Sequence, residues 1–154
     1  MQYDWGAWDA SYTWAIALIG TTVAIHAVGI VAIGSSTRWF WARRLGSRFA
    51  FLHGQPGAIG VIVAIALSLA VLHGIEAAVW AIVYVHLGAF HSTSEAVLYS
   101  VNSITTRGGG GNDMDGHWQM MGAAEAANGM LLFGISTAFL FTVMARLWRN
   151  IDGK

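Results

Sequence analysis

The sequence predicts an all-α membrane protein with three transmembrane helices and a short re-entrant helix between the second and the third. Of the 154 residues, 56% are hydrophobic and only 10% are charged. A soluble domain usually carries about 25% charged residues, so this composition argues against a water-soluble protein. The apolar residues gather in three long runs, and the eight tryptophans suit the aromatic belts of membrane interfaces.

Charge and cysteine content exclude several classes of function. Eight Lys and Arg residues balance eight Asp and Glu residues, so the formal net charge is zero. A neutral chain has no electrostatic attraction for nucleic acid, and we expect no nucleic-acid partner. The chain has no cysteine, which excludes disulfides, thiolate metal sites and cysteine nucleophiles. The sequence shows no arrangement of nucleophile, base and orienting group, so we expect no enzyme.

The spans follow from the apolar runs, taken in order along the chain. The first transmembrane helix is expected at 12–36, after an N-terminal tail. The second, at 54–90, contains a 34-residue apolar run. As a helix this run would measure about 51 Å, so it must tilt or project beyond a hydrocarbon core of about 30 Å. The remaining expected segments are the tail 1–11, the third helix 118–148 and the final tail 149–154.

Basic residues orient these spans. Four arginines lie in the segment 37–53 and further basic residues follow the third span, whereas the first 37 residues contain no Lys or Arg. The positive-inside rule therefore makes 37–53 and the C-terminus cytoplasmic, and the N-terminus external. We expect a multi-pass protein of the cell membrane. The aromatic and basic segment 37–53 is either an amphipathic helix on the membrane surface or a basic loop that only sets topology.

The external segment 91–117 has the pattern of a pore loop. Ser92 and Glu95 have capping-box spacing, which predicts a helix start, and the next apolar stretch is about three turns long, too short to span. A backbone-presenting run then follows: Thr105, Thr106, Arg107, Gly108, Gly109, Gly110 and Gly111. Irregular backbone at membrane depth is tolerated only inside protein or along a water-filled path.

The segment 100–110 resembles the pore of the potassium-channel family, in which a short pore helix ends in Thr-Thr and leads into Val-Gly-Tyr-Gly. Thr105, Thr106, Gly108 and Gly110 stand on the matching positions. The flanking residues resemble the outer and inner helices of small bacterial ion-channel proteins, so the resemblance covers about 57–145. It implies a homotetramer in the lipid membrane, with permeant monovalent ions rather than a bound cofactor. In that family, filter carbonyls replace the hydration shell of K⁺.

Three departures from the family pattern alter the expected selectivity. Arg107 replaces Val, Gly109 replaces Tyr, and Gly111 stands where an acidic residue is expected. Gly109 cannot brace the filter strand, so we expect weakly selective cation flow. If Arg107 points into the pore, its charge favours anions. If it points backward it needs a partner, because an unpaired buried charge is very costly. The candidate filter-supporting residues are Asn102, His73, Glu76 and Glu125.

Further candidate positions lie at the two ends of the expected pore. Glu95, Asp113 and Asp115 would make an acidic mouth that concentrates cations. Asp113, Asp115 and His117 are weak candidates for a divalent metal, the alternative being a solvated loop. On the inner helix, a face that includes a hinge candidate at Gly134 would line the cavity and gate. Its other members are Ala127, Leu131, Ala138 and Thr142.

Alternatives remain open for one pair of residues and for the chain as a whole. His73 and Glu76, three residues apart, form a helix–helix clamp or a proton or cation sensor. His26, His73 and His86 are the residue type that ligates haem in helical membrane proteins, so a haem-b membrane anchor is the main rival class. Because the filter pattern is altered, the chain could also keep the channel fold without conducting. It would then serve as a scaffold subunit of a larger membrane assembly.

Overall fold

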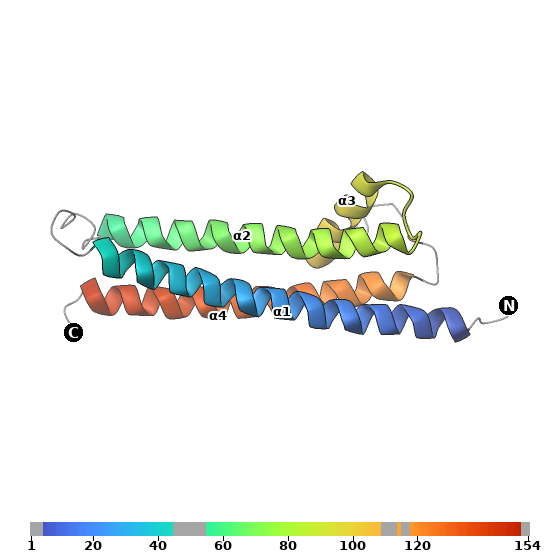
Figure 1. Cartoon of the computed structure of the whole chain (residues 1–154), viewed down its shortest axis with the longest axis horizontal. Helices are drawn as coiled ribbons and strands as arrows, with labels where there is room; N and C mark the ends of the chain where they lie inside the picture. Colours follow the sequence, from blue (N-terminus) through green and yellow to red (C-terminus); the bar gives the residue numbers. More distant parts are fainter. Residues whose placement is uncertain (1–4, 45–54, 109–113, 115–117, 152–154) are drawn as a thin grey trace. The chain divides into compact units, whose positions relative to one another are not determined.

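The computed structural model describes residues 5–44, 55–108, 114 and 118–151 (Figure 1). Over these residues the chain forms four helices: α1 Trp5–Arg44, α2 Gln55–His86, α3 Thr93–Ile104 and α4 Gln119–Ile151. The expected all-α architecture is therefore confirmed. Part of the expected filter and pore mouth lies outside the described residues, namely Gly109, Gly110, Gly111, Asp113, Asp115 and His117.

Three of the helices are long and apolar enough to cross a membrane. The candidate spans are Ala10–Thr37 in α1, Gly57–His86 in α2 and Gln119–Arg149 in α4. Within their most apolar windows, only 17%, 22% and 11% of the residues, respectively, are buried inside the chain. The remaining residues of these windows expose apolar surface. Contact of this surface with water is unfavourable, so lipid or neighbouring chains must cover it. The prediction of three helices able to span a membrane is confirmed.

The first helix is longer than its apolar run. It begins at Trp5 and ends at Arg44, so it includes part of the expected tail 1–11 and of the basic segment 37–53. The sequence offers no Pro or Gly between Ser35 and Arg44 that would stop a helix. Loss of hydropathy marks the end of the membrane-compatible stretch, but it does not by itself end the helical hydrogen bonding.

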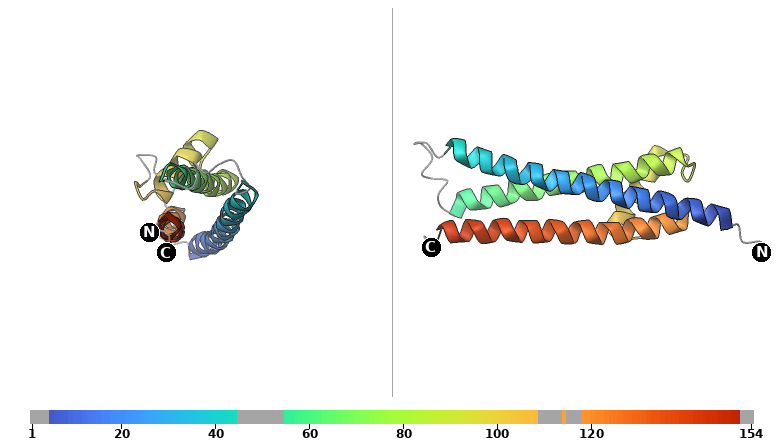
Figure 2. Two further views of the ribbon diagram at one scale, coloured as in Figure 1. Left: turned by 90° about the vertical axis from the view of Figure 1, so that its left-hand side faces the viewer. Right: turned by 60° about the horizontal axis from the view of Figure 1, so that its bottom comes forward.

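The chain divides into two compact units, and each long helix contributes to both. The first unit comprises residues 1–26 and 73–133, and the second comprises 27–72 and 134–154. The first unit thus contains α3 with the adjoining parts of α2 and α4. In Figures 1 and 2, α3 lies beside the end of α2 and the beginning of α4. In the second unit, the backbone of Gly29 approaches the side chain of Leu72.

In the first unit, α1 buries a single narrow stripe. Ser11, Ala15, Leu18, Thr22 and His26 are all buried, and they recur every three or four residues. This spacing places them on one face of the helix. Three of the five carry polar side chains, which is unusual for a buried stripe in an apolar helix. Each of these polar groups needs a partner, and the partners of Thr22 and His26 define the site below.

Candidate functional site

The short helix α3 is held against α4 at unusually close range. A Cβ atom at Gly129 would collide with the backbone carbonyl of Ile104, the last residue of α3. One at Gly122 would meet the hydroxyl of Tyr99. Glycines seven residues apart on α4 lie on one face, so they leave room for the two ends of the contact with α3. This close approach places the C-terminal end of α3 beside the first half of α4.

A buried carboxylate lies between these two glycines. The hydroxyl of Tyr84 donates to Glu125 Oε2 at 2.7 Å, and Ser100 is hydrogen-bonded to Glu125 Oε1. Ser100 also lies 2.7 Å from the carbonyl oxygen of Ala77. We call Tyr84, Ser100 and Glu125 the Glu125 cluster. It joins α2, α3 and α4, and all three of its side chains are fully buried.

One arrangement of hydrogens in the Glu125 cluster satisfies both contacts of Ser100 with a neutral acid. Ser100 has one hydroxyl hydrogen, whereas both the Ala77 carbonyl and Glu125 lie within hydrogen-bonding distance of it. Both bonds form together when Ser100 donates to the carbonyl and a protonated Glu125 donates to Ser100. A neutral acid also suits this site, because an unpaired ionised carboxylate is costly to bury.

Aromatic side chains close around the Glu125 cluster. The ring of Tyr84 meets Tyr99 edge-on, with centroids 5.7 Å apart, and Phe90 edge-on at 6.1 Å. Trp80 lies 6.0 Å from Tyr84 on the same helix. Phe90, Trp80 and Tyr84 all belong to the buried hydrophobic core of the first unit. The cluster therefore sits in a dry setting that holds Tyr84 in one orientation.

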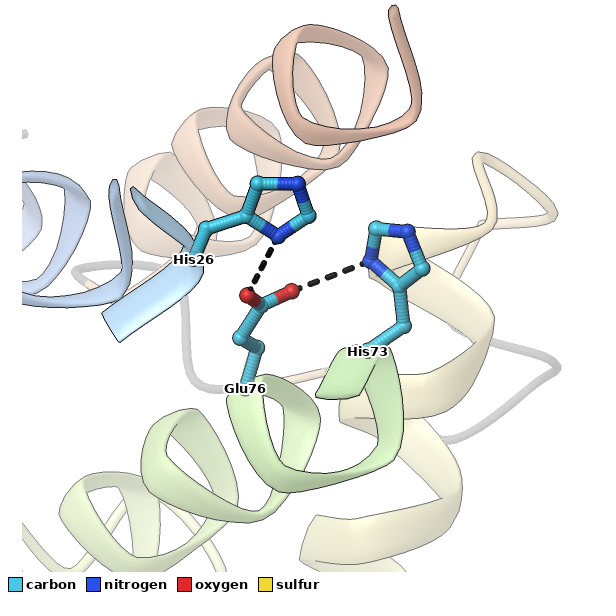
Figure 3. Close-up of side chains that lie close together, drawn as sticks. All are labelled: His26, His73 and Glu76. Atoms are coloured by element: carbon cyan, nitrogen blue, oxygen red, sulfur yellow. Dashed lines mark hydrogen bonds and ion pairs between the residues drawn. The ribbon is translucent and has the colours of Figure 1, made fainter. Parts of the chain in front are cut away.

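A second buried carboxylate joins α1 to α2. His26 Nδ1 lies 2.7 Å from Glu76 Oε1, and His73 Nδ1 lies 3.0 Å from Glu76 Oε2. Figure 3 shows both imidazoles turned toward the same carboxylate, one from each helix. Glu76 and His26 are fully buried, and the exposed fraction of His73 is 9%. We call these three residues the Glu76 cluster. His73 also stacks on Phe133 of α4, with ring centroids 4.1 Å apart.

One turn before His26, a hydrogen bond joins α1 to α4. Asn128 Nδ2 donates to Thr22 Oγ1 at 2.8 Å, and both residues are buried. The amide oxygen of Asn128 is buried and has no hydrogen-bond partner among the residues that the structure describes. Sequence reasoning missed this contact. The available signal was the four-residue spacing of Thr22 and His26, which puts two polar side chains on one face of an apolar helix.

The predicted start of α3 is confirmed, although not through its side-chain cap. Ser92 is the N-cap residue and has an extended backbone, but its side chain makes no capping hydrogen bond. Its hydroxyl lies 2.7 Å from that of Ser94 instead. Glu95, expected at the pore mouth, is in the first helical turn and is exposed.

The end of α3 is a Schellman motif built on the Thr-Thr-Arg sequence. The amide of Thr106 donates to the Ser103 carbonyl, and the amide of Arg107 donates to the Asn102 carbonyl, both at 2.8 Å. Thr106 takes a φ of +61°, a left-handed conformation that is strained for a β-branched residue. Gly108, with a φ of +78°, takes such a conformation without strain. The single strained residue of this turn therefore falls within the expected filter.

Arg107 does not adopt the backward pose onto a buried carboxylate. Its side chain is exposed and forms no ion pair with the acidic residues that the structure describes. Glu76 is engaged by two histidines and Glu125 by two hydroxyl groups. Asn102 is half-buried and meets Arg107 through its backbone carbonyl. Both carboxyl groups are therefore engaged by side chains other than the Arg107 guanidinium.

The expected cavity face of α4 is exposed in the single chain. α4 remains helical through Gly134, the expected hinge. The exposed residues on this face are Ala127, Leu131, Gly134, Ala138 and Thr142. The Thr142 hydroxyl donates to the carbonyl of Ala138 at 2.8 Å, so it satisfies its own helix.

The comparisons with known proteins add no family to this geometry. The chain matches no protein-family model, no curated protein and no solved structure. The function of the chain is therefore inferred from its residues and from the contacts just described.

Proposed function

We propose that the chain is one subunit of a tetrameric, potassium-channel-like ion pore with altered selectivity. In this proposal α3 is the pore helix and residues 105–111 form the filter. The observation that carries it is the placement of α3. A 12-residue helix between two membrane-spanning helices is clamped to α4 by two glycine contacts and Glu125, and it ends at the Thr-Thr-Arg-Gly sequence.

Exposed apolar surface supports assembly around an axis. α3 buries one face, while Val97, Leu98 and Val101 on its other face have exposed fractions of 40%, 60% and 42%. Leu131 on α4 is 50% exposed. One chain supplies one quarter of a four-fold filter, so heterologous contacts that close after four copies would complete it. The unburied faces of α3 and α4 are the surfaces that such contacts would use.

Arg107 is the residue that we expect to control ion choice. Because Glu76 and Glu125 have other partners, nothing described within the chain neutralises its charge. If four copies lay about 6 Å from an ion in the filter, they would repel a cation by roughly 11 kcal/mol at an effective dielectric of 20. The pore would then pass anions or nothing. If the assembly instead supplies a partner for Arg107, weakly selective cation flow follows.

The membrane orientation is part of the proposal. Residues 37–53 and the C-terminus lie in the cytoplasm, and the N-terminus and 91–117 lie outside the cell membrane, as the positive-inside rule indicates. An added cysteine near residue 8 should react with a membrane-impermeant reagent on intact cells, whereas one near residue 46 should not. The opposite labelling pattern would reverse the topology.

The decisive test combines symmetry with ion flux. Particles in lipid nanodiscs should show four chains with residues 105–111 on the axis, and reversal potentials in planar bilayers should show little preference for K⁺ over Na⁺. Arg107→Val with Gly109→Tyr should increase K⁺ selectivity, whereas Arg107→Lys, which keeps the charge, should not. A monomer, or strong K⁺ preference of the unmodified protein, would overturn the proposal.

A tetramer without conductance would favour the scaffold alternative. The specific observation in its favour is the Schellman turn. In this turn the carbonyls of Asn102 and Ser103 accept backbone hydrogen bonds, and the chain bends at Thr106. The haem alternative requires a Soret band in the absorbance spectrum of the purified protein. His26 and His73 both direct Nδ1 at Glu76, and their ring centroids lie 5.2 Å apart.

A further inference from the structure

We infer that the Glu76 cluster is a binding site for a divalent first-row transition metal ion, with Zn²⁺ as the expected occupant. The site would lie between α1 and α2 in the apolar part of the first unit. All three ligands come from one chain, so the site forms whether or not the chains assemble and whether or not they conduct ions. The inference therefore does not depend on the proposed function.

The geometry brings the correct atoms together. One donor atom from each of His26, His73 and Glu76 lies within 4.8 Å of the other two. Zinc binds imidazole nitrogen and carboxylate oxygen at about 2.0–2.2 Å, which sets neighbouring ligand atoms about 3.4 Å apart in a tetrahedron. The two nitrogen–oxygen separations are now 2.7 and 3.0 Å. Each needs to open by less than about 1 Å to reach that spacing.

The charge balance of the membrane-spanning segments also calls for a cation here. Residues 1–37, 54–90 and 118–145 contain no Lys or Arg. Glu76 is fully buried, and an ionised carboxylate at that depth is costly unless a positive charge compensates it. A divalent cation bound among the three side chains would supply that positive charge.

The second histidine completes a donor set for a metal. Each imidazole turns Nδ1 toward its own oxygen of Glu76, so two nitrogen ligands and one carboxylate converge. Two neutral imidazoles and one carboxylate are a common donor set for zinc and other first-row divalent ions. His26 comes from α1 and His73 and Glu76 from α2, so the ion would join the N-terminal helix to the next span.

The test uses the full chain in nanodiscs, after removal of any histidine tag. Protein purified without chelator should contain about one Zn²⁺ per chain, as measured by inductively coupled plasma mass spectrometry. After chelation, added Co²⁺ should produce the visible d–d absorption of a low-symmetry nitrogen and oxygen site, and Zn²⁺ should displace it. His26→Gln, His73→Gln and Glu76→Gln should each weaken Zn²⁺ binding by more than about 100-fold. These changes keep polar side chains of similar size.

His86→Gln is the matched control, because His86 is exposed on the same helix as His73 and should leave binding unchanged. Zn²⁺ should raise the melting temperature of the unmodified protein and of His86→Gln, but not that of the three cluster variants. The inference is overturned if the unmodified protein contains no stoichiometric metal and binds neither Co²⁺ nor Zn²⁺ at micromolar concentration. It is also overturned if His86→Gln loses the metal while His26→Gln keeps it. The first result would leave the cluster as a proton-bridged clamp.

Discussion

The Glu76 cluster and the Glu125 cluster solve the same problem with different chemistry. Each places a fully buried carboxylate in an apolar unit and anchors it through two side chains; for Glu125 both lie on other helices, whereas for Glu76 one lies on α1 and one on its own helix. Glu125 receives hydroxyl partners, and its hydrogen count suits a neutral acid. Glu76 receives two imidazoles, whose nitrogens can also ligate a metal ion.

This difference separates a fixed support from an adaptable one. The hydroxyl partners of Glu125 do not change charge near neutral pH, so they hold α3 against α4 without a change of their own charge. Imidazoles ligate metal ions, so the contact between α1 and α2 can respond to a bound metal. The predicted pore elements depend on the fixed cluster, and the additional first helix depends on the adaptable one.

The largest expected effect comes from removing the fixed support. Glu125→Ala should lower the free energy of unfolding by about 3 kcal/mol, because it leaves the Tyr84 and Ser100 hydroxyls without their shared partner. Glu125→Gln should cost less than about 1 kcal/mol, since an amide can accept from Tyr84 and donate to Ser100. Denaturant unfolding in detergent measures both. Equal losses for the two variants would show that a neutral amide does not replace the carboxyl group of Glu125.

The next effect tests the close approach of α3 to α4. Gly129→Ala should cost about 1–3 kcal/mol, because its Cβ meets the backbone carbonyl of Ile104, which cannot rotate away. Gly122→Ala should cost less, since it meets only the end of the Tyr99 side chain. Gly74→Ala is the control, with nothing within 4 Å of its Cβ. Melting temperatures that fall equally for all three variants would show that the glycine contacts do not hold α3 against α4.

A smaller effect tests the attachment of α1. Thr22→Val should cost about 1 kcal/mol, because Asn128 loses its hydrogen-bond acceptor inside the unit. Thr21→Val should be close to neutral, since Thr21 is exposed and its hydroxyl bonds only to the carbonyl of Ala17 on its own helix. Unfolding midpoints of the two variants give the comparison. A loss confined to Thr21→Val would mean that the other face of α1 makes the contact.

The smallest effect has the opposite sign. Thr106→Gly should raise the free energy of unfolding by about 0.5 kcal/mol, because the relief of the left-handed strain exceeds the added backbone entropy. Thr105→Gly should instead destabilise, since Thr105 has an ordinary φ of −88°. Thermal unfolding of both variants is the measurement. Destabilisation by Thr106→Gly would indicate that residue 106 leaves the left-handed conformation in the folded protein.

Much of the fold could be predicted because it depends on local pattern. Hydropathy and length identified the three long helices, and Ser92 marked the beginning of α3. The ends of α1 were harder to predict from the sequence, because hydropathy declines before helical hydrogen bonding stops. The importance of Glu76, His73 and Glu125 was also readable, since ionisable groups are rare in apolar spans and need partners there.

The sequence by itself determined that these carboxylates must be compensated, and only the tertiary structure decided by what. His26 reaches Glu76 across 50 residues, and Tyr84 reaches Glu125 across 41. No helical periodicity encodes contacts over such separations. Arg107 was a reasonable partner by charge, yet histidines and hydroxyls on adjoining helices occupy both carboxylates. The physical reason is that burial requires partners whose helices already pack together, and that packing is set by small residues such as Gly129 at the contact.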